Sequence, residues 1–132
     1  MIEKTLTVTL PWPSRVLFPN ARTFWANKAR AVKRHRAWGY WGAFEQLMAA
    51  QMKPAPIGKV RYRIIVVPKC YRNRDEDNLV AACKSYLDGI ADAMRVNDKI
   101  FTIRGVDVVD PDKSRPNISI ELTWDEDNGE QQ

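Results

Sequence analysis

The 132-residue chain contains little cysteine and almost no histidine. It has two cysteines, Cys70 and Cys83, and a single histidine, His35. Three such residues without paired spacing match no zinc pattern, which excludes a structural zinc fold. In a reducing compartment a disulfide is not expected. Cys83 falls on the apolar side of a predicted helix, so we expect its thiol to be buried.

Long apolar runs are also missing. No stretch approaches the roughly 18 residues that a membrane span needs, and residues 1–4 lack the basic-then-apolar layout of a signal peptide. We therefore expect a cytoplasmic protein with no membrane contact. A hydrophobic content of 45% and a charged content of 28% are typical of one globular domain of this length.

The charge is uneven along the chain. The formal net charge is +5, with 21 Lys and Arg against 16 Asp and Glu. Four of the 16 acids lie in residues 125–132, so residues 1–124 hold 21 bases against 12 acids, a charge of +9. A body this basic favours a polyanionic partner, with nucleic acid first. We expect a domain over 1–124 and an acidic, disordered tail over 125–132.

Hydrophobic periodicity predicts four strands, at residues 4–10, 59–67, 100–109 and 117–124. Helical patterns predict two helices, at about residues 23–51 and 77–94. The order strand-helix-strand-helix-strand-strand favours a single α+β domain, in which two helices pack on a four-stranded mixed sheet. The last two strands, joined by the turn-rich residues 110–113, are expected to form an antiparallel hairpin.

The second predicted helix carries an apolar stripe and a charged ridge. At about 100° per residue, the ridge places Asp77, Lys84 and Asp88 together on the polar side, with Asp75 just before it. The opposite side is the expected core stripe. Its residues are Leu79, Cys83, Tyr86, Leu87, Ile90 and Met94.

Two interpretations of these acids stay open from spacing alone. A hard divalent cation needs several converging oxygen ligands, which Asp75 and Asp77 could supply together with Asp98, where the chain turns back after the helix. Alternatively, acids at a helix start favour the macrodipole and cap free N–H groups. In that case Lys84 and Asp88 form an ordinary i,i+4 pair.

The central motif resembles that of the RusA family of Holliday junction resolvases. The family pattern is Asp-x-Asp-Asn-Leu, a Lys, an Asp before a small and an aliphatic residue, and later an Asp-Asp pair. The corresponding residues here are Asp75-Glu76-Asp77-Asn78-Leu79, Lys84, Asp88-Gly89-Ile90 and Asn97-Asp98. The opening, with Leu10-Pro11-Trp12-Pro13-Ser14 and Pro19-Asn20-Ala21-Arg22, is also similar. The resemblance reaches to about Trp124.

The resemblance implies a RusA-like fold, a homodimer, and Mg²⁺-dependent resolution of four-way DNA junctions by paired symmetric phosphodiester hydrolysis. Asp75, Asp77 and Asp98 would be the catalytic, metal-binding carboxylates, with Mn²⁺ as a substitute metal, and Lys84 would be the catalytic lysine. Two positions depart from the family. Lys84 follows Asp77 by seven residues instead of four, and Asn97 replaces the first acid of the Asp-Asp pair.

The first predicted helix changes from basic to apolar along one face. Its second half carries Trp41, Phe44, Leu47 and Met48 at core spacing, so we expect only the first half to extend beyond the core towards DNA phosphates or a partner subunit. Further bases lead into the acidic motif. The expected DNA-binding residues are Lys28, Arg30, Lys33, Arg34, Arg36, Lys69, Arg72 and Arg74.

Other interpretations remain open. The same metal site could act on flaps, replication forks or RNA, because branch recognition depends on shape and dimer geometry. The departures at Lys84 and Asn97 keep a third possibility, a branched-DNA-binding module without catalysis. Trp12 and Trp25 could stack on an unpaired base or pack in the fold, and His35 is expected to contact a phosphate or to have no role.

Overall fold

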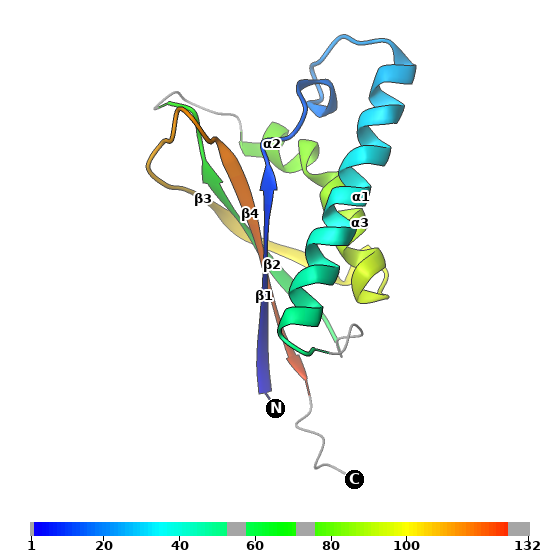
Figure 1. Ribbon diagram of the computed structural model, residues 1–132, viewed down its shortest axis with the longest axis vertical. Coiled ribbons are helices and arrows are strands. Elements are labelled where there is room, and N and C mark those ends of the chain that lie inside the picture. The colour runs from blue at the N-terminus through cyan, green and yellow to red at the C-terminus, as the bar shows by residue number, and fades with distance from the viewer. Residues whose placement is uncertain (1, 53–57, 71–75, 127–132) are drawn as a thin grey trace.

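The computed structural model describes residues 2–52, 58–70 and 76–126 (Figure 1). The strands are β1 (Ile2–Pro11), β2 (Val60–Val67), β3 (Phe101–Val108) and β4 (Asn117–Glu126). The helices are α1 (Trp25–Ala49), α2 (Glu76–Ala82) and α3 (Lys84–Met94). Two short 3-10 turns are η1 (Arg15–Leu17) and η2 (Asp98–Ile100).

The four strands form one mixed sheet in the order β1-β4-β2-β3. β4 is antiparallel to both of its neighbours, whereas β2 and β3 are parallel. The predicted α+β domain with a four-stranded mixed sheet is confirmed, but the predicted hairpin between the last two strands is wrong. β4 pairs with both β1 and β2 inside the sheet, whereas β3 lies at an edge and is mostly exposed.

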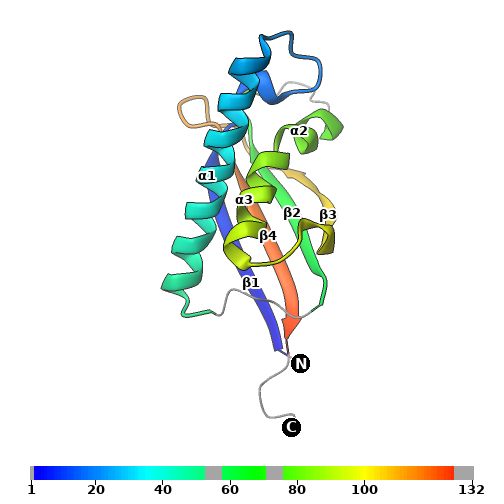
Figure 2. The same ribbon diagram turned by 90° about the vertical axis from the view of Figure 1, so that its right-hand side faces the viewer.

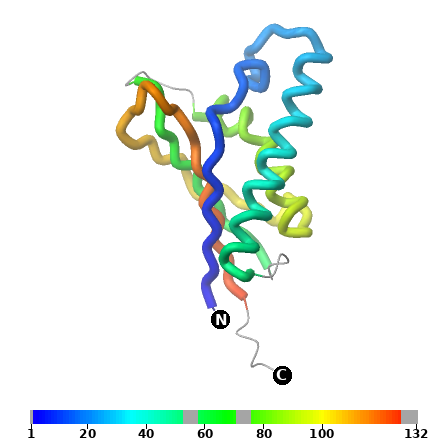
Figure 3. Tube along the Cα trace, viewed as in Figure 1, coloured from blue at the N-terminus to red at the C-terminus, as the bar shows by residue number. Residues whose placement is uncertain are grey.

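The helices cover one face of the sheet (Figure 2), and in the described part of the chain no helix packs on the other face (Figure 1). Between the layers lies the main core, which contains alternate residues of β1, β2 and β4 and the inner sides of the helices. The predicted stripe of the second helix is confirmed, because all six of its residues are buried. The described chain starts and ends side by side, since Ile2 pairs with Glu126 (Figure 3).

The predicted helix over 77–94 is broken in two at Cys83, giving three helices instead of two. The Cys83 N–H donates to both Leu79 O and Val80 O, at 3.1 Å each, which tightens the chain there. α2 contributes to two core clusters, because Leu79 lies in the main core and Ala82 does not. Ala82 packs with Leu17 and Ala31 in a small second cluster, while Cys83 belongs to the main core. Burial raises the pKa of the Cys83 thiol to about 12.

Helices α1 and α3 approach closely at two glycines. A Cβ on Gly39 would collide with the Tyr86 carbonyl oxygen, and one on Gly89 would collide with the Arg36 carbonyl oxygen. The backbones of the two helices are therefore in contact at this crossing, and this contact sets how closely α3 packs on α1.

β4 runs two residues further than the sequence predicts. Asp125 pairs with Glu3 and Glu126 with Ile2, so the first two residues of the expected tail belong to the sheet. The other six, residues 127–132, lie outside the described residues. No helix in the described part of the chain is long and apolar enough to cross a membrane.

Candidate functional site

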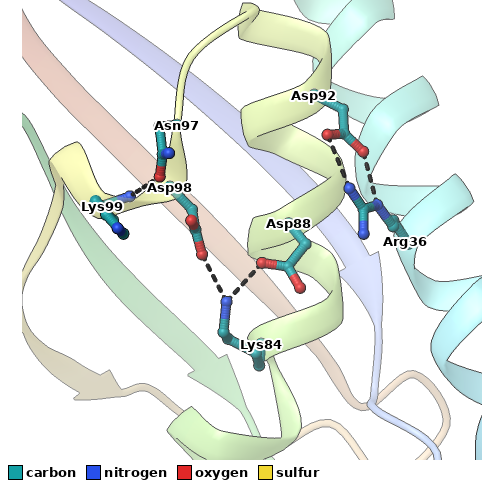
Figure 4. A network of polar contacts seen from close by, with 7 residues as sticks. All are labelled: Arg36, Lys84, Asp88, Asp92, Asn97, Asp98 and Lys99. Atoms are coloured by element: carbon teal, nitrogen blue, oxygen red, sulfur yellow. Dashed lines mark hydrogen bonds and ion pairs between the residues drawn. The ribbon is translucent and has the colours of Figure 1, made fainter.

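Lys84, the first residue of α3, lies between two carboxylates (Figure 4). Its Nζ is 2.6 Å from Asp88 Oδ1, one turn along the same helix, and 2.6 Å from Asp98 Oδ2 of η2. The structure therefore brings together two of the predicted catalytic residues, Lys84 and Asp98, from opposite ends of α3. It adds Asp88, which the sequence placed on the polar ridge and, in one of the two interpretations, paired with Lys84 at i,i+4; that ion pair is present.

The turn after α3 returns Asp98 to this position. Arg95 takes a left-handed conformation (φ 60°), and the Val96 N–H donates to Ala91 O, which ends the helix. The Asn97 side chain then accepts from the Lys99 N–H at 2.9 Å and caps η2. Asn97 thus has a structural role at the position where the family has an acid.

The three charges stabilise one another. Hydrogen bonds to Asp88 and Asp98 raise the pKa of Lys84, and the hydrogen bond from Lys84 lowers the pKa of Asp98. The Lys84 side chain is 62% exposed, compared with 26% for Asp88 and 38% for Asp98. The cluster is therefore open to a ligand from solvent.

A second ion pair lies one turn further along α3. Arg36 of α1 holds Asp92 with two hydrogen bonds, Nε to Oδ2 at 2.7 Å and Nη2 to Oδ1 at 3.0 Å (Figure 4). Both ion pairs line a hollow of about 390 Å³. Arg36, predicted to contact DNA, is thus engaged within the protein, where it links α1 to α3.

The other two predicted metal ligands, Asp77 and Asp75, are not part of this cluster as the structure describes it. Asp77 is exposed in the first turn of α2, so the break at Cys83 puts it on a different helix from Lys84 and Asp88. Asp75 lies outside the described residues. Among the residues described, no group of three or more His, Cys, Asp or Glu side chains is close enough to hold a metal ion.

The described residues of the site carry a net negative charge. Asp88 and Asp98 direct carboxylate oxygens at one point, and the group found there is the Lys84 ammonium. One positive charge between two negative ones leaves a local charge of −1, which an additional cation would offset.

The basic residues of α1 lie where the helix extends past the end of β1 (Figure 1). Its inner side there contacts the preceding loop and α2, because Ala31 packs on Leu17 and Ala82. Lys28, Arg30, Lys33 and Arg34 are all exposed, as is Lys69 beyond β2. Arg72 and Arg74 lie outside the described residues.

His35 is buried, so the expectation of a phosphate contact is wrong. Its Nε2 accepts the Ser14 N–H at 3.0 Å, so Nδ1 carries the proton and donates to Ala31 O at 2.9 Å. The ring stacks on Tyr86 at 4.8 Å. Burial lowers the pKa of His35. The neutral imidazole therefore attaches the proline-rich loop to α1.

The outer side of α1 carries exposed aromatic residues that the sequence assigned to the core. Of the four residues expected inside, only Leu47 is buried. The buried stripe repeats every four residues and uses mainly small side chains: Ala31, His35, Gly39, Ala43 and Leu47. That spacing of Ala and Gly was the signal for the true inner side. We call the exposed set the aromatic face; it consists of Trp38, Trp41, Phe44 and Met48.

Contacts between neighbouring aromatic rings hold the side chains of the aromatic face in position. Trp41 lies edge-on to both Tyr40 and Phe44, with centroids 4.9 and 5.6 Å apart. Trp41 is nevertheless 62% exposed. Trp38 lies under the Arg34 guanidinium, 5.6 Å from the ring centroid, where the face meets the basic half of α1.

Comparison with known protein families found no family model that matches the chain. A protein of Xylella fastidiosa (strain Temecula1 / ATCC 700964), described as an uncharacterized protein, is 36% identical over 101 residues. The match covers 76% of this chain and 65% of that relative's length. Among solved structures, thiamine-monophosphate kinase from Stenotrophomonas maltophilia K279a aligns with 96% of this chain and 32% of its own, at a TM-score of 0.38 and 13% identity. A likeness this distant carries no functional meaning.

Proposed function

We propose that this chain is a Mg²⁺-dependent endodeoxyribonuclease of RusA-like fold that resolves four-way DNA junctions in the cytoplasm. One observation carries the proposal: the Lys84 ammonium lies 2.6 Å from the Asp98 carboxylate, although the two residues are 14 positions apart. Both belong to the motif that resembles the RusA family. Their proximity agrees with a shared site for charge chemistry.

Three carboxylates would hold the metal: Asp75, Asp77 and Asp98, with Mn²⁺ able to replace Mg²⁺. When bound, such a metal supplies Lewis acidity and an activated water for phosphodiester hydrolysis. Lys84 would then offset the charge that builds up on the phosphate. Its exposed side chain, on the open side of α3, is accessible to a DNA backbone.

The bases on the first half of α1, together with Lys69, would bind phosphates on either side of the cut. Contacts of this kind fix the position of the DNA without reading its sequence. They also offset the repulsion between the acidic site and the DNA. Arg36 would contribute by fixing α3 through Asp92, not by contacting DNA.

The active form would be a homodimer, joined through the aromatic face of α1. Glu45 is the only charged residue between positions 37 and 50, and such depletion of charge is typical of the centre of a protein interface. If two α1 helices meet antiparallel around Trp41, their basic halves lie at opposite ends and do not repel one another. Two sites related by a twofold axis would suit paired cuts in a junction.

A branched-DNA-binding module without catalysis is the second candidate. The observations that favour it are the complete pairing of Lys84 with two acids and the structural role of Asn97. Such a module would bind junctions with or without Mg²⁺ and cut nothing. A nuclease for forks or flaps is a further alternative, with the same metal site and a different substrate.

The deciding experiment incubates the protein with a labelled four-way junction, a fork, a flap and a linear duplex, each with Mg²⁺ or EDTA. Paired symmetric nicks in the junction that require Mg²⁺ are expected. Asp77→Asn should abolish them while leaving junction binding intact. The matched control is Asp107→Asn, because Asp107 pairs with Arg63 on the sheet instead. Binding without cutting would support the second candidate, and preferential fork or flap cleavage the third.

A further inference from the structure

The two carboxylates around Lys84 are held in different ways. Asp88 is four residues after Lys84 on the same helix, so the helix itself sets their spacing. Asp98 belongs to η2 and reaches Lys84 only because the chain reverses after α3. The Lys84–Asp98 contact therefore depends on the chain reversal after α3, whereas the Lys84–Asp88 contact depends only on the residue spacing within the helix.

Asp88 also lies on a firmly held part of the backbone. The next residue, Gly89, has its α-carbon against the backbone of Arg36, so α3 cannot move closer to α1 at this point. The Asp88 side chain is the least exposed of the three, at 26%. It is thus a fixed anion beside a more exposed, flexible lysine.

A cation arriving at Asp98 would compete with the Lys84 ammonium for the same carboxylate. An ammonium with Asp98 as its sole partner would either block the cation or swing away into solvent. With Asp88 as a second partner, Lys84 can release Asp98 and keep one charge-assisted hydrogen bond. Arg36 does not serve instead, since its Nε and Nη2 are engaged by Asp92.

We propose that Asp88 is a positioning residue, which retains Lys84 beside the site when a divalent cation takes Asp98. This inference rests on the proposed metal-dependent function and adds to it a role for a fourth acidic residue. Asp88 acts through Lys84 and touches neither the metal nor the DNA. Its effect should therefore disappear when Lys84 is absent.

A double-mutant cycle on cation affinity tests this dependence. Mn²⁺ binding is measured by calorimetry for the wild type, Asp88→Asn, Lys84→Met and the double variant, with no DNA present. Asp88→Asn is expected to weaken Mn²⁺ binding about fivefold or more when Lys84 is present, and by less than about twofold in the Lys84→Met background. Asp88→Glu, which still reaches Lys84 at i,i+4, should restore binding. Asp107→Asn is the control, because Asp107 pairs with Arg63 on the sheet, and it should leave the affinity within about twofold of the wild type.

The possible failures are distinct. If Asp88→Asn weakens binding equally in both backgrounds, Asp88 acts only as one more negative charge, and the positioning role is overturned. An unchanged affinity overturns it as well. If the wild type binds no Mn²⁺, the metal-dependent function fails, and the inference fails with it. Circular dichroism of each variant separates these outcomes from misfolding, and Asp88→Glu keeps the test open if Asp88→Asn does not fold.

Discussion

The α-carbon of Gly89 lies against the Arg36 carbonyl, so the backbones of α3 and α1 are in contact at this position. Two side-chain pairs flank this contact along α3: Lys84 with Asp88 before it, and Arg36 with Asp92 after it. The candidate site is therefore built on the part of the molecule where two helices are closest. The close packing of the two helices and the positions of these charged side chains therefore both depend on Gly89.

Gly89→Ala should be strongly destabilising, because the added methyl would collide with backbone that has no rotamer to change. We expect a loss of about 3 kcal/mol in the free energy of unfolding, at the upper end for overpacking. Urea titration followed by circular dichroism measures it. Gly105→Ala is the control, since among the described residues, its two chain neighbours aside, no atom lies within 4 Å of its new Cβ. Equal, small effects at both positions would show that the helices are not in contact.

His35 should make stability depend on pH below neutrality. Its pKa is lowered by folding, so the unfolded chain binds the proton more tightly, and protonation favours unfolding. The contribution of His35 to stability is fully present above the unfolded-state pKa of about 6.5. It is lost as the pH falls from there to the lower folded value, with a slope of at most about 1.4 kcal/mol per pH unit. Urea titrations between pH 7.5 and 5 measure the slope.

The matched variant for this prediction is His35→Gln, which can still accept the Ser14 N–H but does not titrate in this range. It should flatten the pH dependence between 5 and 7 while lowering stability at every pH through poorer packing against Tyr86. A slope that survives in His35→Gln would assign the effect to other groups.

Trp41→Arg should convert a dimer into a monomer. The substitution places a positive charge in a face that has almost none and removes a large apolar contact. Light scattering after size-exclusion chromatography measures the mass, with the wild type expected at twice the chain mass of 15.2 kDa. Trp25→Arg is the control, as Trp25 is 74% exposed on the same helix but lies outside the aromatic face. A monomeric wild type would contradict the proposed interface.

Lys33→Ala should weaken DNA binding in a salt-dependent way. If Lys33 contacts a phosphate, its removal lowers the slope of log K against log salt by about 1, for all sequences alike. Fluorescence anisotropy with a junction at several salt concentrations gives the slope. Lys59→Ala serves as the control, because this exposed lysine precedes β2 and is not part of α1. An identical slope in Lys33→Ala and the wild type would remove Lys33 from the interface.

The candidate site was only partly predictable. The motif named Lys84 and Asp98, which the structure brings together, and the loop position of Asp98 indicated its return towards the helix. Asp77, which the motif also named, lies on a different helix. The sequence contained no signal that Lys84 would hold Asp88 and Asp98 at once, because that contact depends on how the turn at Arg95 ends α3. The break at Cys83 was equally hidden, since the apolar stripe continues across it.

What the sequence by itself determined is the position of the four strands and of the two helical segments, and the inner sides of most of them. Alternating residues in β1 and β4 and the stripe from Leu79 to Met94 are local patterns, which follow from the backbone period alone. Tertiary structure decided the strand order, the side of α1 that packs, and the place where Lys84 meets Asp98. Each of these depends on competition among segments far apart in the chain. In α1 the large aromatic residues indicated one side, but Gly39 and Ala43 allowed the closer approach, and the closer packing prevailed.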